Sequence, residues 1–221
     1  MLKINGERLW ASLMAMAEIG ATARGGSCRL ALSAEDQAGR ELFSHWCTAA
    51  GLTLSVDAVG NLFARRAGTE SDAAPVMMGS HLDTQPEGGR FDGVYGVLAG
   101  LEVIRSLDDH GIQTRKPLEI AVWTNEEGAR FTPAMLGSAV FTGTLALDKA
   151  LATADSDGVS VAEALRATGY NGSRPLGGAV DAYFEAHIEQ GPILEDNAKS
   201  IGVVTGGQAI RWLDVRVEGM A

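Results

Sequence analysis

Residues 80–92, SHLDTQPEGGRFD, bring a histidine, two aspartates and a glutamate together directly after the apolar run PVMMG. If the backbone stays extended, His81 and Asp83 share one face. An imidazole is a good zinc ligand, and a carboxylate behind it can orient the ring. Asp92 precedes Gly93, and the glycines of this loop allow the backbone to fold closely around an ion. The alternative interpretation is a solvated turn in which Asp92 caps the following helix.

Glu126 and Glu127 are adjacent carboxylates that leave the apolar run PLEIAVWTN. Neighbouring side chains diverge in a regular strand, so both can serve one site only where the chain bends, and Gly128 favours a bend. One carboxylate could then bind a metal ion while the other accepts a proton from a water molecule. The alternative is a pair of solvated acids in a loop.

His187 falls on the polar face of the run AYFEAHIEQG, between Glu185 and Glu189. A histidine in such a setting is usually a surface residue. The position of all these groups at strand ends favours a shared site, because ligands gather at the carboxyl ends of strands in open α/β sheets.

Hydrophobic periodicity predicts an α/β fold with a mixed, largely parallel sheet flanked by helices. The predicted helices cover residues 5–19, 33–51, 94–107, 145–152 and 161–167. The predicted strands cover residues 52–59, 61–66, 73–80, 117–125, 182–191, 201–207 and 210–219. Asn5 and Ser33 are the predicted caps of the first two helices, the second with Asp36 in a capping box.

The composition excludes several classes of partner. With 18 Lys and Arg against 28 Asp and Glu the formal charge is −10, and no basic patch is present to neutralise phosphates, so we expect no nucleic-acid partner. No apolar stretch is long enough to predict secretion or membrane insertion. Cys28 and Cys47 lack the pairing of a thiolate zinc site and fit a reducing cytoplasm.

Three motifs, HLDTQPEGGRFDGVYGVLAGLE, WTNEEGARFTPAMLGSAVF and HIEQGP, together resemble the amidase, hydantoinase and carbamoylase family of dinuclear zinc hydrolases. Its members include N-carbamoyl-L-amino-acid hydrolases, beta-ureidopropionases and allantoate amidohydrolases. The resemblance covers essentially the whole chain. It implies a zinc exopeptidase-like catalytic domain that hydrolyses the carbamoyl C–N bond of a small ureido or carbamoyl amino acid.

The resemblance also implies two divalent metal ions, zinc in the first place, with manganese, cobalt or nickel as alternatives. His81, Asp92 and His187 would bind one ion. Asp92 would bridge to a second ion that also binds Glu127.

Three further roles follow from the same resemblance. Glu126 would be the general base, and Asp83 would lie behind His81. Gln190 would contact the substrate. Peptidase relatives tend to carry a carboxylate where this chain has His187, which favours a carbamoylase over a dipeptidase or aminoacylase of the same superfamily.

One expected ligand is missing from the sequence. The family pattern includes a further histidine toward the C-terminus, whereas the histidines here are His45, His81, His110 and His187. Residues 1–210 are therefore predicted to be the N-terminal portion of a catalytic domain, and residues 211–221 the start of a truncated lid and dimerisation domain. The full-length protein is expected to be a homodimer. A partial chain is expected to expose apolar surface and to be poorly stable or inactive alone. The alternative to an enzyme is a non-catalytic, truncated homologue that binds metal.

Overall fold

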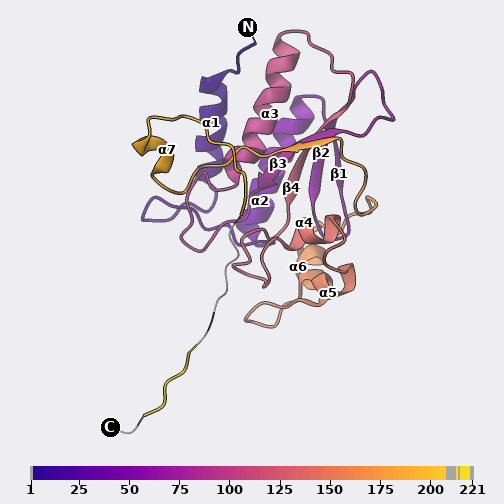
Figure 1. Cartoon of the computed structure of the whole chain (residues 1–221). Coiled ribbons are helices and arrows are strands. Elements are labelled where there is room, and N and C mark those ends of the chain that lie inside the picture. The colour runs from indigo at the N-terminus through magenta and orange to yellow at the C-terminus, as the bar shows by residue number, and fades with distance from the viewer. Residues whose placement is uncertain (1, 208–212, 214, 220–221) are drawn as a thin grey trace. The chain divides into compact units, whose positions relative to one another are not determined.

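The computed structural model describes residues 2–207, 213 and 215–219. The chain divides into two compact units, Met1–Ile188 and Glu189–Ala221, each of which is described by itself. The first unit holds the sheet and most of the helices (Figure 1). Among the described residues, no helix combines the length and the apolar character needed to cross a membrane.

The first unit is built on one mixed five-stranded sheet with the order β1-β2-β4-β3-β5. The strands are β1 (Thr53–Val56), β2 (Leu62–Arg66), β3 (Val76–His81), β4 (Leu118–Trp123) and β5 (Ala182–Phe184). β2 runs antiparallel to both β1 and β4, whereas β3 runs parallel to β4 and to β5. The predicted mixed α/β sheet is confirmed, and its parallel part consists of β4, β3 and β5.

Three long helices cover one face of this sheet: α1 (Gly6–Ala17), α2 (Ala34–Ala49) and α3 (Val94–Asp109). α3 packs on β3 and β4, and α1 packs on α3 (Figure 1). Alternate strand residues such as Leu62 and Ile120 join the apolar side chains of the helices in the main core. The predicted caps Asn5 and Ser33 are confirmed, because each side chain accepts a backbone N–H of its helix.

The opposite face of the sheet carries a smaller apolar cluster around Phe63 and Trp123, against which Phe141 packs. Three short helices, α4 (Leu136–Phe141), α5 (Leu147–Ala152) and α6 (Val161–Thr168), contribute to a separate core. The sequence predicted α5 and α6 and missed α4, whose sequence LGSAVF contains a glycine, a poor helix former.

The sequence overestimated the strands of the last forty residues. The strand predicted over 182–191 is regular only in β5, and residues 201–207 form no strand. Val203 is 86% exposed, so the apolar residues of that run bury no surface that would hold them in a sheet. The second unit contains α7 (Ile193–Asp196), which the sequence did not predict.

Residues 210–212 and 214 of the strand predicted over 210–219 lie outside the described residues. Residues 215–219 have no regular secondary structure. The domain boundary predicted at residue 211 stays a prediction.

Candidate metal centre

The candidate site lies at the carboxyl ends of the three parallel strands. His81 is the last residue of β3 and is in register with Trp123, the last residue of β4. Glu126 therefore follows β4 close to the end of β3. β5 flanks β3 on its other side and leads to His187. The topology thus brings together groups that are more than 100 residues apart in the sequence.

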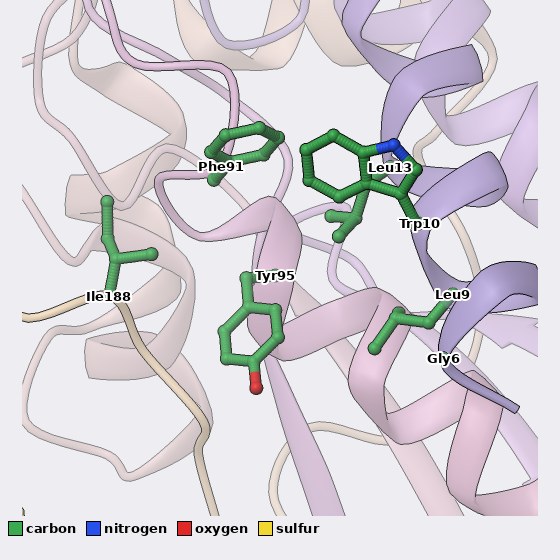
Figure 2. Close-up of a pocket in the computed structure, with 7 residues that line it drawn as sticks. All are labelled: Gly6, Leu9, Trp10, Leu13, Phe91, Tyr95 and Ile188. Atoms are coloured by element: carbon green, nitrogen blue, oxygen red, sulfur yellow. The ribbon is translucent and has the colours of Figure 1, made fainter. Parts of the chain in front are cut away.

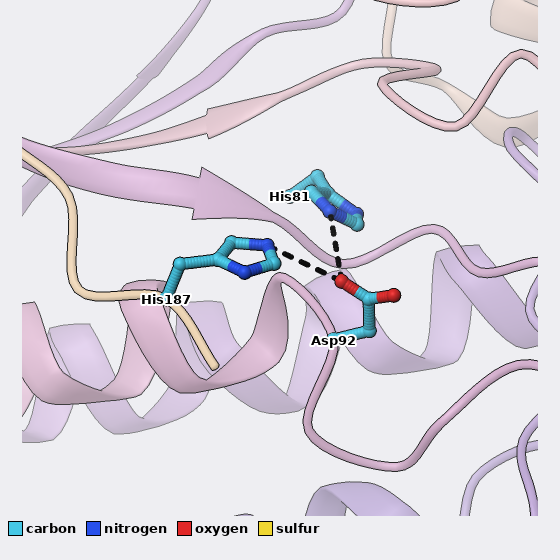
Figure 3. A group of neighbouring side chains, drawn as sticks. All are labelled: His81, Asp92 and His187. Carbon is cyan, nitrogen blue, oxygen red and sulfur yellow. Dashed lines mark ion pairs between the residues drawn. The ribbon is translucent and has the colours of Figure 1, made fainter. Parts of the chain in front are cut away.

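His81, Asp92 and His187 form a cluster whose potential ligand atoms all lie within 4.8 Å of one another (Figure 3). Both imidazoles face the same carboxylate oxygen: Asp92 Oδ1 is 3.2 Å from His187 Nε2 and 3.9 Å from His81 Nε2. His81 is buried, Asp92 is half-buried and His187 is exposed. The structure therefore places these three predicted ligands around one point.

The hydrogen bond at Nδ1 determines the tautomer of each of the two histidines. His81 Nδ1 lies 2.8 Å from the carbonyl oxygen of Asp83, and His187 Nδ1 lies 2.8 Å from the carbonyl oxygen of Ile188. A carbonyl oxygen only accepts, so Nδ1 must carry the hydrogen in both rings. This leaves the lone pair of each neutral imidazole on Nε2, the nitrogen that faces Asp92, as a metal ligand requires.

The electrostatic environment of His81 favours a positive charge. Burial alone would lower the pKa of His81, but the nearby carboxylates of Asp83 and Glu126 outweigh it and raise the pKa. The same negative charges would favour the binding of a metal cation at His81 Nε2.

Asp83 has a connection that the sequence did not reveal. Its buried carboxylate accepts the backbone N–H groups of Glu126 and Glu127, each at 3.2 Å. Oδ1 is 4.0 Å from His81 Nδ1, so the carboxylate lies near the ring while the ring's hydrogen bond goes to the Asp83 carbonyl. Burial raises the pKa of Asp83 to about 6, against the lowering effects of His81 and the two N–H groups.

Glu126 and Glu127 lie between two residues with a positive φ, Asn125 and Gly128, so the predicted bend is confirmed. Glu126 Oε2 lies 3.4 Å from His81 Nε2. Burial and the carboxylates of Glu127, Glu185 and Asp92 raise the pKa of Glu126, although His81 opposes the shift.

The side chain of Glu127 has a different partner from that of Glu126. Its Oε2 accepts a hydrogen bond from Gln85 Nε2 at 2.8 Å. Its Oε1 is buried and has no hydrogen-bond partner among the described residues. A buried carboxylate oxygen without a donor is costly unless a cation or a water molecule satisfies it.

The residues fit divalent metal ions. The cluster offers two imidazole nitrogens and a shared carboxylate oxygen, which is a donor set that zinc accepts. The unpaired oxygen of Glu127 is a further candidate ligand, and the surrounding carboxylates would repel one another without a cation. The identity and number of ions stay predictions.

Gly93 lies directly against the imidazole of His81. It has φ +67°, and a Cβ built on it would overlap the imidazole of His81. Gly93 is also the N-cap of α3, which has no side-chain cap. The alternative role of Asp92 as the helix cap is therefore wrong, and the Asp92 side chain faces the two imidazoles instead.

An apolar cavity of about 290 Å³ lies between α1, the start of α3 and Ile188 (Figure 2). Its lining consists of Gly6, Leu9, Trp10, Leu13, Phe91, Tyr95 and Ile188. Phe91 and Ile188 are sequence neighbours of the candidate ligands Asp92 and His187. The cavity itself offers no histidine, cysteine or carboxylate side chain among its lining residues, so the chemistry is carried by the His81 cluster.

Gln190 belongs to the second unit, so its predicted contact with substrate is untested. Ser80 and Glu185, which the sequence did not single out, are hydrogen-bonded beside the cluster at 2.6 Å. Only the register of β3 against β5 could have suggested that pair.

An open mixed sheet with imidazole and carboxylate side chains that could bind a metal ion at its parallel strand ends suits a metal-dependent hydrolase. Residues 77–220 match the family model described as Peptidase family M20/M25/M40, and the chain belongs to this metal-dependent family.

Two curated relatives are named as carbamoylases. The chain is 51% identical to an N-carbamoyl-L-amino-acid amidohydrolase of Rhizobium meliloti, over 98% of this chain and 52% of the relative. It is 43% identical to an N-carbamoyl-L-amino acid amidohydrolase of Geobacillus stearothermophilus, over 99% of this chain and 54% of the relative. The chain thus spans about half the length of the curated relatives it matches.

A solved structure supports the fold. A hydantoinase/carbamoylase family amidase from Burkholderia ambifaria has a TM-score of 0.93 and 69% identity, covering 94% of this chain and 51% of that chain. The resemblance stated from the three sequence motifs and the predicted α/β fold are both confirmed.

Proposed function

We propose that the protein is an amidohydrolase that cleaves the carbamoyl C–N bond of N-carbamoyl-L-amino acids or related ureido acids. The observation that carries this proposal is the convergence of His81 Nε2 and His187 Nε2 on one oxygen of Asp92, with Glu126 3.4 Å from His81. The names of the relatives supply the substrate class.

Five side chains would hold the metal ions or support them. His81, Asp92 and His187 would bind the first ion, and Asp92 together with Glu127 would bind a second. Asp83 would fix both the ring of His81 and the turn that carries Glu127. When bound, such ions act as Lewis acids on the ureido carbonyl and make water more acidic.

Glu126 would act as the general base. Its raised pKa makes it a stronger base than an exposed glutamate, and its Oε2 lies 3.4 Å from Nε2 of the predicted ligand His81. Glu126 would take a proton from the attacking water and deliver it to the amino nitrogen as the C–N bond breaks. The products would be the free amino acid and carbamic acid, which decomposes to carbon dioxide and ammonia.

Three further features belong to the same proposal. Gln190 would contact the substrate, the full-length protein would be a homodimer, and the compartment would be the cytoplasm. The last feature is proposed from the sequence, whose two cysteines have no disulfide pattern.

The test is a substrate comparison with the protein expressed from its own gene and loaded separately with zinc, manganese, cobalt or nickel. N-carbamoyl-L-amino acids, N-acyl amino acids and dipeptides are supplied in parallel, and Glu126→Gln is the control. We expect release of the amino acid from the carbamoyl substrates and its loss in Glu126→Gln. Turnover of acyl or dipeptide substrates alone would identify an aminoacylase or dipeptidase, and metal binding without any turnover would identify a non-catalytic homologue.

A further inference from the structure

The backbone pairing between β3 and β5 ends before it reaches the cluster. The pairs are Val76–Ala182, Met77–Tyr183 and Met78–Phe184. Continued for three residues on each strand, this register would set His81 level with His187. The ladder stops at Phe184, however, so the backbone hydrogen bonds of the sheet do not hold His187.

A side-chain hydrogen bond takes over where the ladder stops. Ser80, which is fully buried and directly precedes His81, donates its hydroxyl to Glu185 Oε1 at 2.6 Å. Glu185 stands two residues before His187. This bond therefore ties the segment that carries the exposed histidine to the strand that carries the buried one.

The second oxygen of Glu185 is also engaged. Glu185 Oε2 accepts the hydroxyl of Tyr183 at 2.8 Å, and that hydroxyl accepts the indole N–H of Trp123 at 2.9 Å. Trp123 ends β4 and is in register with His81. Because both oxygens of Glu185 accept hydrogen bonds, the carboxylate is suited to fix the chain and is poorly suited to ligate an ion.

α3 also packs closely against this segment. A Cβ built on Gly96 would lie 2.6 Å from the carbonyl oxygen of Ala186 and 2.9 Å from Ser80 Cβ. Only glycine lets the chain pass this closely between α3 and β3. The segment before His187 is thus in contact with α3 at Ala186 and with Ser80 at Glu185.

We propose that Ser80 and Glu185 form a tether that positions His187 as a metal ligand. The inference rests on the proposed metal centre and adds two residues whose role would be to position a ligand. An exposed histidine on an irregular segment must lose conformational freedom to bind an ion, and the tether removes much of that freedom before binding. Loss of residues that orient a ligand typically weakens metal affinity about 10- to 100-fold.

The test is a titration of the metal-free chain with zinc by calorimetry and with cobalt by visible absorption, which reports the coordination geometry. The variants are Ser80→Ala, Glu185→Ala and Glu185→Gln. We expect the two alanine variants to bind zinc about 10- to 100-fold more weakly and to change the cobalt spectrum. Glu185→Gln keeps an oxygen that accepts the Ser80 hydroxyl, so it is expected to restore most of the affinity.

Ser106→Ala is the matched control. Ser106 is a buried serine that donates to a glutamate oxygen, Glu102 Oε1, at 2.9 Å in the same unit. It is expected to lower the thermal unfolding midpoint while leaving zinc affinity and the cobalt spectrum unchanged. Wild-type affinity and spectrum in both Ser80→Ala and Glu185→Ala would overturn the tether alone. A wild-type chain that takes up no ion would overturn both the metal centre and the tether.

Discussion

The carboxylate of Asp83 accepts the backbone N–H of Glu126 at 3.2 Å, across 43 residues of sequence. The same carboxylate accepts the N–H of Glu127, and the Asp83 carbonyl accepts Nδ1–H of His81. One buried residue therefore sets the orientation of a predicted ligand on β3 and of the two acids that follow β4.

Replacing Asp83 with alanine should disturb both stability and metal binding. The change leaves the N–H groups of Glu126 and Glu127 without an acceptor, at a cost of about 1–3 kcal/mol for each group that stays buried. We expect a lower free energy of unfolding in urea and weaker zinc binding. Asp57→Ala is the control, because Asp57 is a buried aspartate that accepts the N–H groups of Val59 and Asn61. Equal zinc affinities in wild type and Asp83→Ala would contradict this account.

Gly93→Ala should act through His81. The new methyl group would overlap the imidazole, and the positive φ adds strain. Gly111→Ala separates the two effects, because Gly111 has φ +63° with nothing within 4 Å of a built Cβ. Gly111→Ala is expected to cost about 1–2 kcal/mol of stability with unchanged zinc affinity. Gly93→Ala should cost more and lose tight zinc binding, and a variant that binds zinc like wild type would show that the His81 position is not decisive.

The Arg8–Glu102 pair should stabilise the contact between α1 and α3. Arg8 Nη2 lies 2.8 Å from the buried Glu102 carboxylate, which also accepts the N–H of Asn5. Arg8→Met is expected to lower the free energy of unfolding by about 1.5–3 kcal/mol. Arg115→Met is the control: its partner Glu70 is 3.4 Å away and both side chains are exposed, so the loss should be about 0–1 kcal/mol.

The same pair makes a prediction for acid pH. Burial alone would raise the pKa of Glu102, but the hydrogen bonds from Arg8, Asn5 and Ser106 outweigh it and lower the pKa. A carboxyl whose pKa is lower in the folded state contributes stability above its unfolded pKa, about 4.3, and loses it as the pH falls through the folded value. Urea unfolding below about pH 4 should therefore show a weaker pH dependence in Arg8→Met than in wild type. Parallel pH profiles of the two proteins would contradict the assignment.

Much of the fold could be predicted because its elements have clear local signals. Asn5 and Ser33 mark helix starts, and the apolar runs before His81 and Asn125 mark buried strands. The apolar pattern of residues 201–207 predicted a strand that the structure does not contain. A strand there would need a neighbouring strand to pair with. Secondary structure that depends on a neighbour cannot be predicted from periodicity alone.

The residues of the candidate site could be predicted from the sequence, but the contacts that position them could not. His81, Asp92 and His187 carry side chains that bind metals wherever they meet, so the motifs identified them. The bonds from Asp83 to Glu126 and from Ser80 to Glu185 join residues 43 and 105 positions apart. Such contacts depend on strand order and register, which a single sequence does not state.

The most direct test of the central claim is calorimetric titration of zinc into the metal-free wild-type chain and into His187→Ala. The account predicts tight zinc binding by wild type and its loss in His187→Ala, because His187 Nε2 lies 3.2 Å from Asp92 and completes the cluster with His81. Circular dichroism confirms that both chains are folded before the titration. Absence of zinc binding in the folded wild type, or equal affinities in the two chains, would contradict the assignment of a metal centre.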